Sequence, residues 1–278
     1  MEGPMTHAIA AELTAGGLWA AGFGTGAAPL WQAHGADLND LPALIDAQGA
    51  SAAPVLVAVA GGARVSVPCA PLAVPAPWEA PALPGTTGDL RLVAQPMLSQ
   101  SSPPALSGGL EFRVAGFLDL NPKFDGVLCL PGAEATLWAL ISADEVVSLS
   151  GFRSGALARA AGGAGLIIDS APRFAEAAAD TLDRPERLAA RLAEAGAARA
   201  LGQLDDAAMQ DRIAGALVGA EMAASRAYWL GQNVAVVGDA GPARAYALVL
   251  EAQGLPVLRA DLDTCRVRGA RRAVSQGL

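Results

Sequence analysis

The sequence predicts a two-lobed α/β protein, and three observations support this prediction. The C-terminal part alternates the strand Asn233–Val237, the helix Pro242–Gln253, the strand Pro256–Arg259 and the helix Thr264–Ser275, which is the order of an α/β unit. The first third contains short apolar runs separated by Gly and Pro, which is typical of strands joined by turns. The 278 residues are 53% hydrophobic and 17% charged, enough to fill one large domain or two ordinary ones.

The first lobe is expected to begin with strands that pair as hairpins. Its apolar runs place four strands at His7–Leu13, Leu18–Phe23, Pro29–Ala33 and Pro54–Ala60. A helix over Asp37–Gln48 is predicted before the fourth strand, because leucine and isoleucine recur there at helical spacing. Asp37 or Asn39 could cap this helix.

A boundary between the lobes is expected in the segment Ser99–Gly109, which is rich in Gln, Ser, Pro and Gly and separates residues 1–107 from 108–278. Prolines also recur from Pro68 to Pro84, so we expect little regular hydrogen-bonded structure in either segment. The second lobe is predicted to contain the helix Val114–Asn121 and the strands Gly126–Leu130, Leu137–Ser142 and Glu145–Leu149. Apolar stripes predict further helices at Arg173–Ala179, Arg184–Glu194 and Ala207–Trp229.

Composition and charge exclude several classes of protein. The longest apolar stretch has roughly ten residues, against the ~20 that a membrane span needs, and no secretory leader is evident, so we expect a cytoplasmic protein. Three cysteines without a CxxC pair indicate reduced thiols, and two histidines argue against a zinc cluster. A net charge of −8 argues against a nucleic-acid surface, and we interpret Arg266–Arg272 as a solvated helix face.

Three glycine-containing segments are candidates for ligand binding. Gly22–Gly26 lies between two strands with no helix after it, so a hairpin turn is favoured over a dinucleotide fingerprint. Gly238–Gly241 lies between a strand and a helix, where backbone amides can bind an anion or simply connect the elements. Gly215 and Gly219 share one helix face, on which either another element or a nucleotide base could lie; Glu221 is a solvated residue or an acceptor there.

No catalytic constellation is evident from the residues alone. Ser150 and Ser154 have no histidine near them in the sequence. For each carboxylate of the second lobe, a place on a solvated loop is favoured over a role as general base. These residues are Glu111, Asp119, Asp125, Glu134 and Asp144.

A family resemblance adds a more specific hypothesis. The stretches that carry it are Val114–Leu118 with Asn121-Pro122, Phe124–Gly132, Glu145–Ser148, Gly215–Glu221, Gly238–Gly241 and Asp263–Gly269. In their order and spacing they resemble the 2-dehydro-3-deoxygalactonokinase family, which are sugar-acid kinases of the actin-like ATPase superfamily. The resemblance covers residues 108–278 well and the first hundred residues weakly.

The resemblance implies two ribonuclease-H-like lobes around a central cleft that holds Mg²⁺ and ATP. The implied reaction moves the γ-phosphoryl group of ATP to the terminal hydroxyl of a 2-dehydro-3-deoxy sugar acid. The implied catalytic residues are Glu12 and Glu111, with Glu12 also the metal ligand, and the implied substrate ligands are Arg113 and Ser154. The implied nucleotide ligands are Thr14, Gly16, Gly132, Gly215, Gly219, Gly238, Asp239, Ala240 and Gly241.

Several motifs depart from the family pattern. The opening Asp-Trp-Gly-Thr-Thr-Asn loop aligns with Glu12–Gly17, which keeps an acid but loses both threonine hydroxyls. Gly-Glu-Glu-Thr-Gln aligns with Gly109–Arg113, which keeps one carboxylate, Glu111. After Pro131-Gly132 the family's histidine and lysine are missing, Thr-Gly-Glu-Leu becomes Ser154–Leu157, and the Gly-Ser-x-x-Gly-Trp segment is shortened to Gly61–Ala63.

These departures leave three hypotheses. The first is an active sugar-acid kinase, in which Glu12 and Glu111 take over metal and proton duties. The second is a catalytically impaired kinase-fold protein, a pseudoenzyme that binds a sugar acid or nucleotide as a sensor. The third is a non-enzymatic partner subunit of an intact kinase. We expect no nucleic acid and no membrane as partners, and a homodimer remains open.

Overall fold

The computed structural model describes residues 5–61, 63–74 and 92–277. Contacts divide the chain into two compact units, residues 1–124, 142–149 and 261–278 in the first and residues 125–141 and 150–260 in the second. The expected boundary after residue 107 falls inside the first unit, and the C-terminal helix is also counted there. Among the described residues, no helix is long and apolar enough to cross a membrane.

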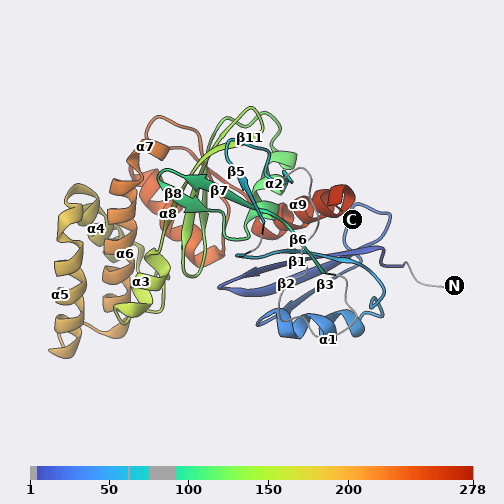
Figure 1. Cartoon of the computed structure of the whole chain (residues 1–278). Helices are drawn as coiled ribbons and strands as arrows, with labels where there is room; N and C mark the ends of the chain where they lie inside the picture. The colour runs from blue at the N-terminus through green and yellow to red at the C-terminus, as the bar shows by residue number, and fades with distance from the viewer. Residues whose placement is uncertain (1–4, 62, 75–91, 278) are drawn as a thin grey trace. The chain divides into compact units, whose positions relative to one another are not determined.

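The first unit is built on a five-stranded sheet with the order β3-β2-β1-β4-β6 (Figure 1). Its strands are β1 (Ala8–Thr14), β2 (Gly17–Phe23), β3 (Trp31–Gly35), β4 (Val55–Ala58) and β6 (Leu92–Ala94). β1, β2 and β3 pair as antiparallel neighbours, whereas β1, β4 and β6 are parallel. The antiparallel start and the hairpin between β2 and β3 are therefore confirmed.

Helices pack on both faces of this sheet. On one face Ile9 and Ala11 of β1 contact α1 (Leu41–Asp46), which a short 3₁₀ turn, Leu38–Asp40, precedes. As predicted, Asp37 caps this turn, because its side chain accepts a hydrogen bond from the amide of Asn39 at 2.7 Å. The other face, which carries Ala10, lies under α2 (Glu111–Leu120) and α9 (Leu262–Gly277).

The helices α2 and α9 cross at two glycines. A side chain on Gly116 would overlap the carbonyl oxygen of Cys265, and one on Gly269 would overlap that of Phe112. The two backbones therefore lie closer together than any larger residue allows. This close crossing fixes the positions of the polar side chains that both helices direct toward β1.

The expectation of little regular structure in the segment Ser99–Gly109 is wrong, because the segment contains strands. β7 (Met97–Ser101) and β8 (Pro104–Leu106) pair antiparallel, and β5 (Arg64–Ser66) adds to β7 as a parallel strand. Proline is compatible with the first residue of an outer strand, since its missing N–H is not needed there. Of the proline-rich segment 68–84, residues 75–84 lie outside the described part of the chain.

A second five-stranded sheet repeats this order, β11-β10-β9-β12-β13. Its strands are β9 (Gly126–Pro131), β10 (Thr136–Ser142), β11 (Glu145–Phe152), β12 (Val234–Val236) and β13 (Val257–Arg259), and it belongs to the second unit except for residues 142–149, which are counted with the first. β9 pairs antiparallel with β10 and parallel with β12, and β12 pairs parallel with β13. The predicted strands of this region are thus confirmed, although their ends shift by a few residues.

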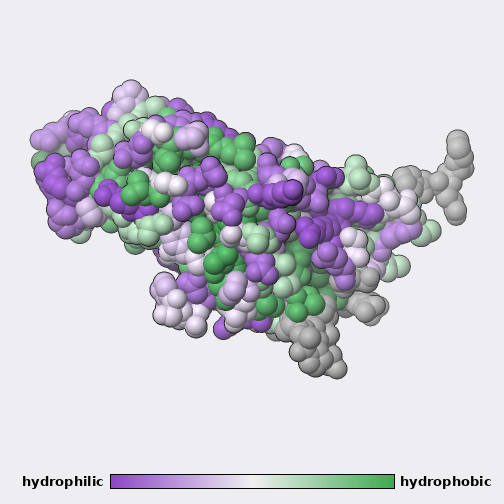
Figure 2. Space-filling model, turned by 90° about the horizontal axis from the view of Figure 1, so that it is seen from above, coloured by the Kyte–Doolittle hydropathy of each residue, from purple (hydrophilic) through white to green (hydrophobic). Residues whose placement is uncertain are grey.

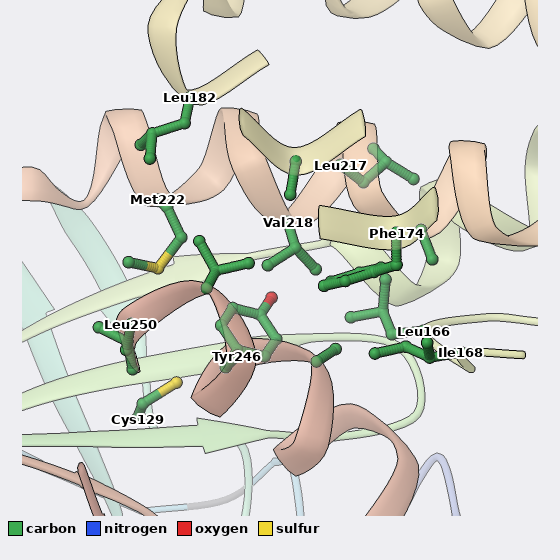
Figure 3. Close-up of a cluster of buried hydrophobic side chains, with 14 of the residues drawn as sticks. Cys129, Leu166, Ile168, Phe174, Leu182, Leu217, Val218, Met222, Tyr246 and Leu250 are labelled. Carbon is green, nitrogen blue, oxygen red and sulfur yellow. The ribbon is translucent and has the colours of Figure 1, made fainter. Parts of the chain in front are cut away.

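Six helices belong to this unit: α3 (Ser154–Ala160), α4 (Ala171–Asp183), α5 (Leu188–Ala200), α6 (Asp206–Ala224), α7 (Arg226–Trp229) and α8 (Ala240–Ala252). The predicted helix over residues 207–229 is two helices that meet at Ser225, and α3 was not predicted. Figure 3 shows the core that they share, where Phe174, Val218, Tyr246 and Leu250 lie among other apolar side chains.

Candidate functional site

The first polar cluster of the first unit surrounds Glu12. Because side chains alternate along β1, Glu12 lies on the same face as Ala10, under α2 and α9, and its side chain is only 1% exposed. Its Oε1 accepts hydrogen bonds from Arg113 of α2, from Nε at 3.0 Å and from Nη2 at 2.8 Å. Nη1 of Arg266, on α9, lies 3.7 Å from the same oxygen. Two guanidinium groups therefore surround one buried carboxylate.

The interpretation of Arg266–Arg272 as a solvated helix face is wrong for Arg266, which is buried. It is 8% exposed, its guanidinium lies 4.7 Å from the centre of the Trp19 ring, and it forms an ion pair with Asp263. The sequence analysis missed it as a site residue. Its spacing to Ala270 and Ala273, both buried, places it on the inner stripe of α9 and is the signal that could have identified it.

The interpretation of Glu111 as a solvated loop residue is also wrong, because Glu111 is a buried helix residue. It is fully buried at the first residue of α2, where its Oε1 accepts hydrogen bonds from the Ser107 hydroxyl and from the amide of Leu98. Burial raises the pKa of Glu111 to about 7, and the negative charge of Glu12 adds to this shift. One oxygen of each carboxylate, Oε2 of Glu12 and Oε2 of Glu111, has no hydrogen-bond partner within the described part of the chain.

The phosphate-loop candidates of the first unit lie at the tip of the hairpin between β1 and β2. Thr14 pairs with Gly17 across the hairpin, so Ala15 and Gly16 form a two-residue turn. The Thr14 hydroxyl accepts a hydrogen bond from the amide of Gly16 at 3.2 Å. Gly16 is exposed, so backbone groups of this turn are accessible from solvent.

The second unit contains another buried carboxylate, Glu221 of α6. Its Oε1 accepts a hydrogen bond from Trp138 Nε1 at 2.8 Å, and its Oε2 accepts from the Tyr246 hydroxyl at 2.6 Å and from the Ser154 hydroxyl. Tyr246 also hydrogen-bonds Thr136, at 2.7 Å. Burial raises the pKa of Glu221 to about 7, because only neutral groups compensate its charge.

The Glu221 network connects β10, α3, α6 and α8 around the loop between β9 and β10. This loop contains Gly132, whose amide donates to the carbonyl of Ala135 at 2.9 Å. In the same loop, the backbone carbonyl of Glu134 accepts a hydrogen bond from the amide of Ala156 in α3, also at 2.9 Å. Ser154, expected as a substrate ligand, is 4% exposed and belongs to this network.

The segment Gly238–Gly241 has the context that the sequence predicts, after β12 and at the start of α8. A side chain on Gly238 would overlap Pro131 at the end of β9, so the two loops lie side by side. Asp239 is the N-cap residue of α8, but its side chain forms no capping hydrogen bond. The first amides of α8, those of Ala240 and Gly241, therefore remain available for an outside acceptor.

Gly215 and Gly219 serve helix packing, which is one of the two interpretations that the sequence left open. A side chain on Gly215 would overlap the carbonyl of Phe174, and one on Gly219 would overlap that of Ala178, both in α4. The face of α6 on which a nucleotide base was considered is therefore covered by α4.

A groove of about 510 Å³ also lies in the second unit, between α4, α5 and α6. It contains none of the predicted site residues and is lined by charged side chains such as Arg173, Asp180 and Arg191. Figure 2 shows hydrophilic residues gathered over these helices, at the left of the view. Asp180 forms ion pairs with three arginines here, so the groove is largely a surface ion-pair network.

Comparisons with known proteins agree with this fold. A family model described as 2-keto-3-deoxy-galactonokinase matches residues 32–273. A solved structure from Sinorhizobium meliloti, provisionally named a 2-dehydro-3-deoxygalactonokinase, is 20% identical and has a TM-score of 0.80, over 97% of this chain and 99% of that one. No curated protein sequence matches the chain.

Two more distant structures share the fold. Component A of the Acidaminococcus fermentans (R)-2-hydroxyglutaryl-CoA dehydratase is 8% identical, with a TM-score of 0.51 over 98% of this chain and 99% of that one. The activator of the Clostridium difficile 2-hydroxyisocaproyl-CoA dehydratase, solved with ADPNP, is 9% identical, with a TM-score of 0.52 over 97% and 95%. The predicted fold class, two ribonuclease-H-like units of the actin-like ATPase type, is confirmed.

Proposed function

Because the chain belongs to the 2-keto-3-deoxy-galactonokinase family, we propose that it transfers the γ-phosphoryl group of ATP to the terminal hydroxyl of 2-dehydro-3-deoxygalactonate. The names 2-keto and 2-dehydro describe the same carbonyl group at C2. The observation that carries this proposal is the family match over residues 32–273, which includes most of both units. The product would be the 6-phosphate of the sugar acid.

For the nucleotide, the proposal uses backbone groups of the second unit. In the second unit, the amides of Ala240 and Gly241 lie at the positive end of α8, where a phosphate group is stabilised. Gly132 and Gly238, in adjoining loops of that unit, extend this surface with backbone alone.

For the sugar acid, the proposal keeps Glu111 as the proton acceptor. A general base is most effective when its pKa is near the working pH, and the pKa of Glu111 is about 7. Glu111 is fully buried, so the proposal requires local opening around it; its Oε2, which has no hydrogen-bond partner among the described residues, would then take the proton of the hydroxyl group. Arg113 and Ser154 are both engaged in buried polar clusters, so we propose supporting roles for them in place of direct substrate contacts.

A kinase family implies a divalent metal as well as ATP, and the metal would neutralise charge on the phosphate oxygens. The residue expected to hold it, Glu12, does not fit this role. Its carboxylate is 1% exposed, and its Oε1 already accepts two hydrogen bonds from a guanidinium group. We therefore derive no step of the reaction through a metal at Glu12.

Phosphorus NMR of the purified protein with Mg²⁺, ATP and 2-dehydro-3-deoxygalactonate tests the proposal. We expect a new sugar-phosphate resonance with an equal amount of ADP, above a blank without the sugar acid. The C4 epimer, 2-dehydro-3-deoxygluconate, should be a poorer acceptor if the family's substrate applies. ATP that stays unchanged in the presence of folded protein would contradict the proposal and favour the sensor or the partner subunit.

Two variants assign the proton acceptor in the same experiment. Glu111→Gln should lower the rate of sugar-phosphate formation by 10²-fold or more, since general-base catalysis contributes about 10²–10⁴-fold. Glu186→Gln is the matched control, because Glu186 is exposed on the second unit, and it should leave the rate unchanged. Equal rates in all three proteins would remove Glu111 from the proposed reaction.

A further inference from the structure

The starting observation is that two departures from the family pattern contact each other. By the resemblance given in the sequence analysis, Glu12 aligns with the aspartate of the family's opening motif and Arg113 with the glutamine of Gly-Glu-Glu-Thr-Gln. They are 101 positions apart in the sequence, yet Arg113 donates two hydrogen bonds to Oε1 of Glu12. The acid is longer by one methylene group, and the amide has been replaced by a guanidinium group.

The surroundings of this pair are closed to solvent and contain a second guanidinium group. Arg113 is 3% exposed and Glu12 is 1% exposed. Arg266 approaches the same oxygen to 3.7 Å, and its position is fixed by the Trp19 ring and by Asp263. Thr14, the nearest hydroxyl along the strand, already accepts a hydrogen bond from Gly16.

We infer that the guanidinium groups of Arg113 and Arg266 take the place of a divalent cation beside Glu12, so that Glu12 binds no Mg²⁺ in this chain. Mg²⁺ requires nearly octahedral oxygen ligands and gives up its water reluctantly. Of the two carboxylate oxygens of Glu12, Oε2 has no partner among residues 5–61, 63–74 and 92–277, and a cation there would lie close to two positive charges in a poorly solvated site. Among the described residues, no group of three or more His, Cys, Asp and Glu side chains could hold a metal ion.

This inference rests on the proposed function in one respect: the kinase reaction is the reason that Mg²⁺ is the metal considered. If Glu12 binds no Mg²⁺, the metal of that reaction would be held by phosphate oxygens of the nucleotide and by residues other than Glu12. The role of Glu12 becomes the positioning of Arg113 and Arg266, which lie on the two helices that cross at Gly116 and Gly269. Its test therefore uses metal binding and not turnover.

The probe is Mn²⁺, whose free form is measured by electron paramagnetic resonance in titrations of the full-length protein with and without a non-hydrolysable ATP analogue. The first variant is the double substitution Glu12→Met with Arg113→Met, which removes both charges and conserves volume. We expect its Mn²⁺ dissociation constants to lie within twofold of those of the unchanged protein. A tenfold or larger weakening in the double variant would show that Glu12 is a ligand and overturn the inference.

The second variant, Arg113→Gln, restores the family's residue. If the guanidinium group excludes the cation, freeing Glu12 should tighten Mn²⁺ binding at least tenfold, and adding Glu12→Gln should abolish that gain. No gain in Arg113→Gln, with circular dichroism showing a folded protein, would overturn the role given to Arg113. A missing sugar-phosphate product would refute the proposed kinase reaction, whereas these titrations would remain interpretable without turnover.

Discussion

Two buried carboxylates, Glu12 of the first unit and Glu221 of the second, are compensated in different ways. Glu12 in the first unit is neutralised by a guanidinium group and approached by a second one. Glu221 in the second unit accepts hydrogen bonds from an indole, a phenol and a hydroxyl, all of which are neutral. Burial of a charge requires a partner charge or a proton, so the Glu221 network takes up a proton near neutral pH and its pKa rises to about 7.

Both clusters also depend on helices that cross at glycines. α2 and α9, which carry Arg113 and Arg266, cross at Gly116 and Gly269. α6, which carries Glu221, packs on α4 at Gly215 and Gly219. The Glu12 and Glu221 clusters therefore differ in the partners of the carboxylate, and not in the way the helices are packed.

Removing the guanidinium group of Arg113 from the Glu12 cluster should cause the largest loss in the free energy of unfolding. Arg113→Met leaves Glu12 buried with only the more distant Arg266, and breaking a buried ion pair costs about 3–5 kcal/mol. Urea unfolding measures the loss of free energy. The double variant Glu12→Met with Arg113→Met should recover most of it; a single variant that loses less than about 1 kcal/mol would show that the pair is not essential.

The second cluster should respond to pH. A raised pKa means that folding favours the protonated carboxyl, so this contribution to stability is complete below pH 4.5, the ordinary value, and is lost as the pH rises through about 7. The loss should be about 3 kcal/mol, at 1.36 kcal/mol for each unit of the difference between 4.5 and about 7. Burial raises the pKa values of its neighbours Cys129 and Tyr246 well above this window, so they do not titrate there.

Unfolding measured from pH 5 to pH 8 checks this expectation. Glu221→Gln should flatten the part of the pH dependence that comes from the second unit. Glu111→Gln is a parallel control, because the pKa of Glu111 is also raised to about 7 and its substitution should flatten a separate part. A Glu221→Gln profile parallel to that of the unchanged protein would contradict the protonated network.

Helix packing should contribute a smaller effect. Gly219→Ala introduces a methyl group against the carbonyl of Ala178 and should destabilise the protein by about 1–3 kcal/mol. Gly196→Ala, in α5 with open space around it, should stabilise by about 0.5–1 kcal/mol. Thermal unfolding of both variants measures the contrast, and two changes of the same sign would refute the assigned packing of α6 on α4.

The smallest change in stability is expected for an arginine–carboxylate pair that lies at the surface. Arg191 and Asp180 are joined by a hydrogen bond of 2.6 Å at the exposed groove of the second unit. Arg191→Ala should leave the unfolding midpoint unchanged within error, since water and salt screen exposed pairs. A shift as large as that of Arg113→Met would mean that burial does not explain the difference between the clusters.

Much of the fold could be predicted from local sequence. Apolar runs between glycines and prolines identified β1, β2, β9 and β12, because these strands are buried on both faces. The outer strands β7 and β8 were missed, since their Ser, Gln and Pro residues resemble a loop when nothing shows that a neighbouring strand pairs with them. α3 was missed for a related reason: it has seven residues and no capping hydrogen bond.

The candidate site was less predictable. Gly238–Gly241 was found because its strand, turn and helix are consecutive in the sequence. The partners of Glu12 come from positions 113 and 266, so only the folded chain shows that its charge is neutralised. The polar contacts of Glu221 likewise come from three other elements, and local sequence left open whether it is solvated.

The most direct test of the contrast between the two units is carbon NMR of protein labelled at the glutamate carboxyl carbon, recorded from pH 4 to pH 9, with Glu221→Gln used to assign the signal. We predict that the Glu221 carboxyl titrates with a midpoint of about 7, as a group that takes up a proton when no cation lies beside it. A midpoint near its ordinary value of 4.5 would show that the neutral donors alone hold the charge, and would contradict the account.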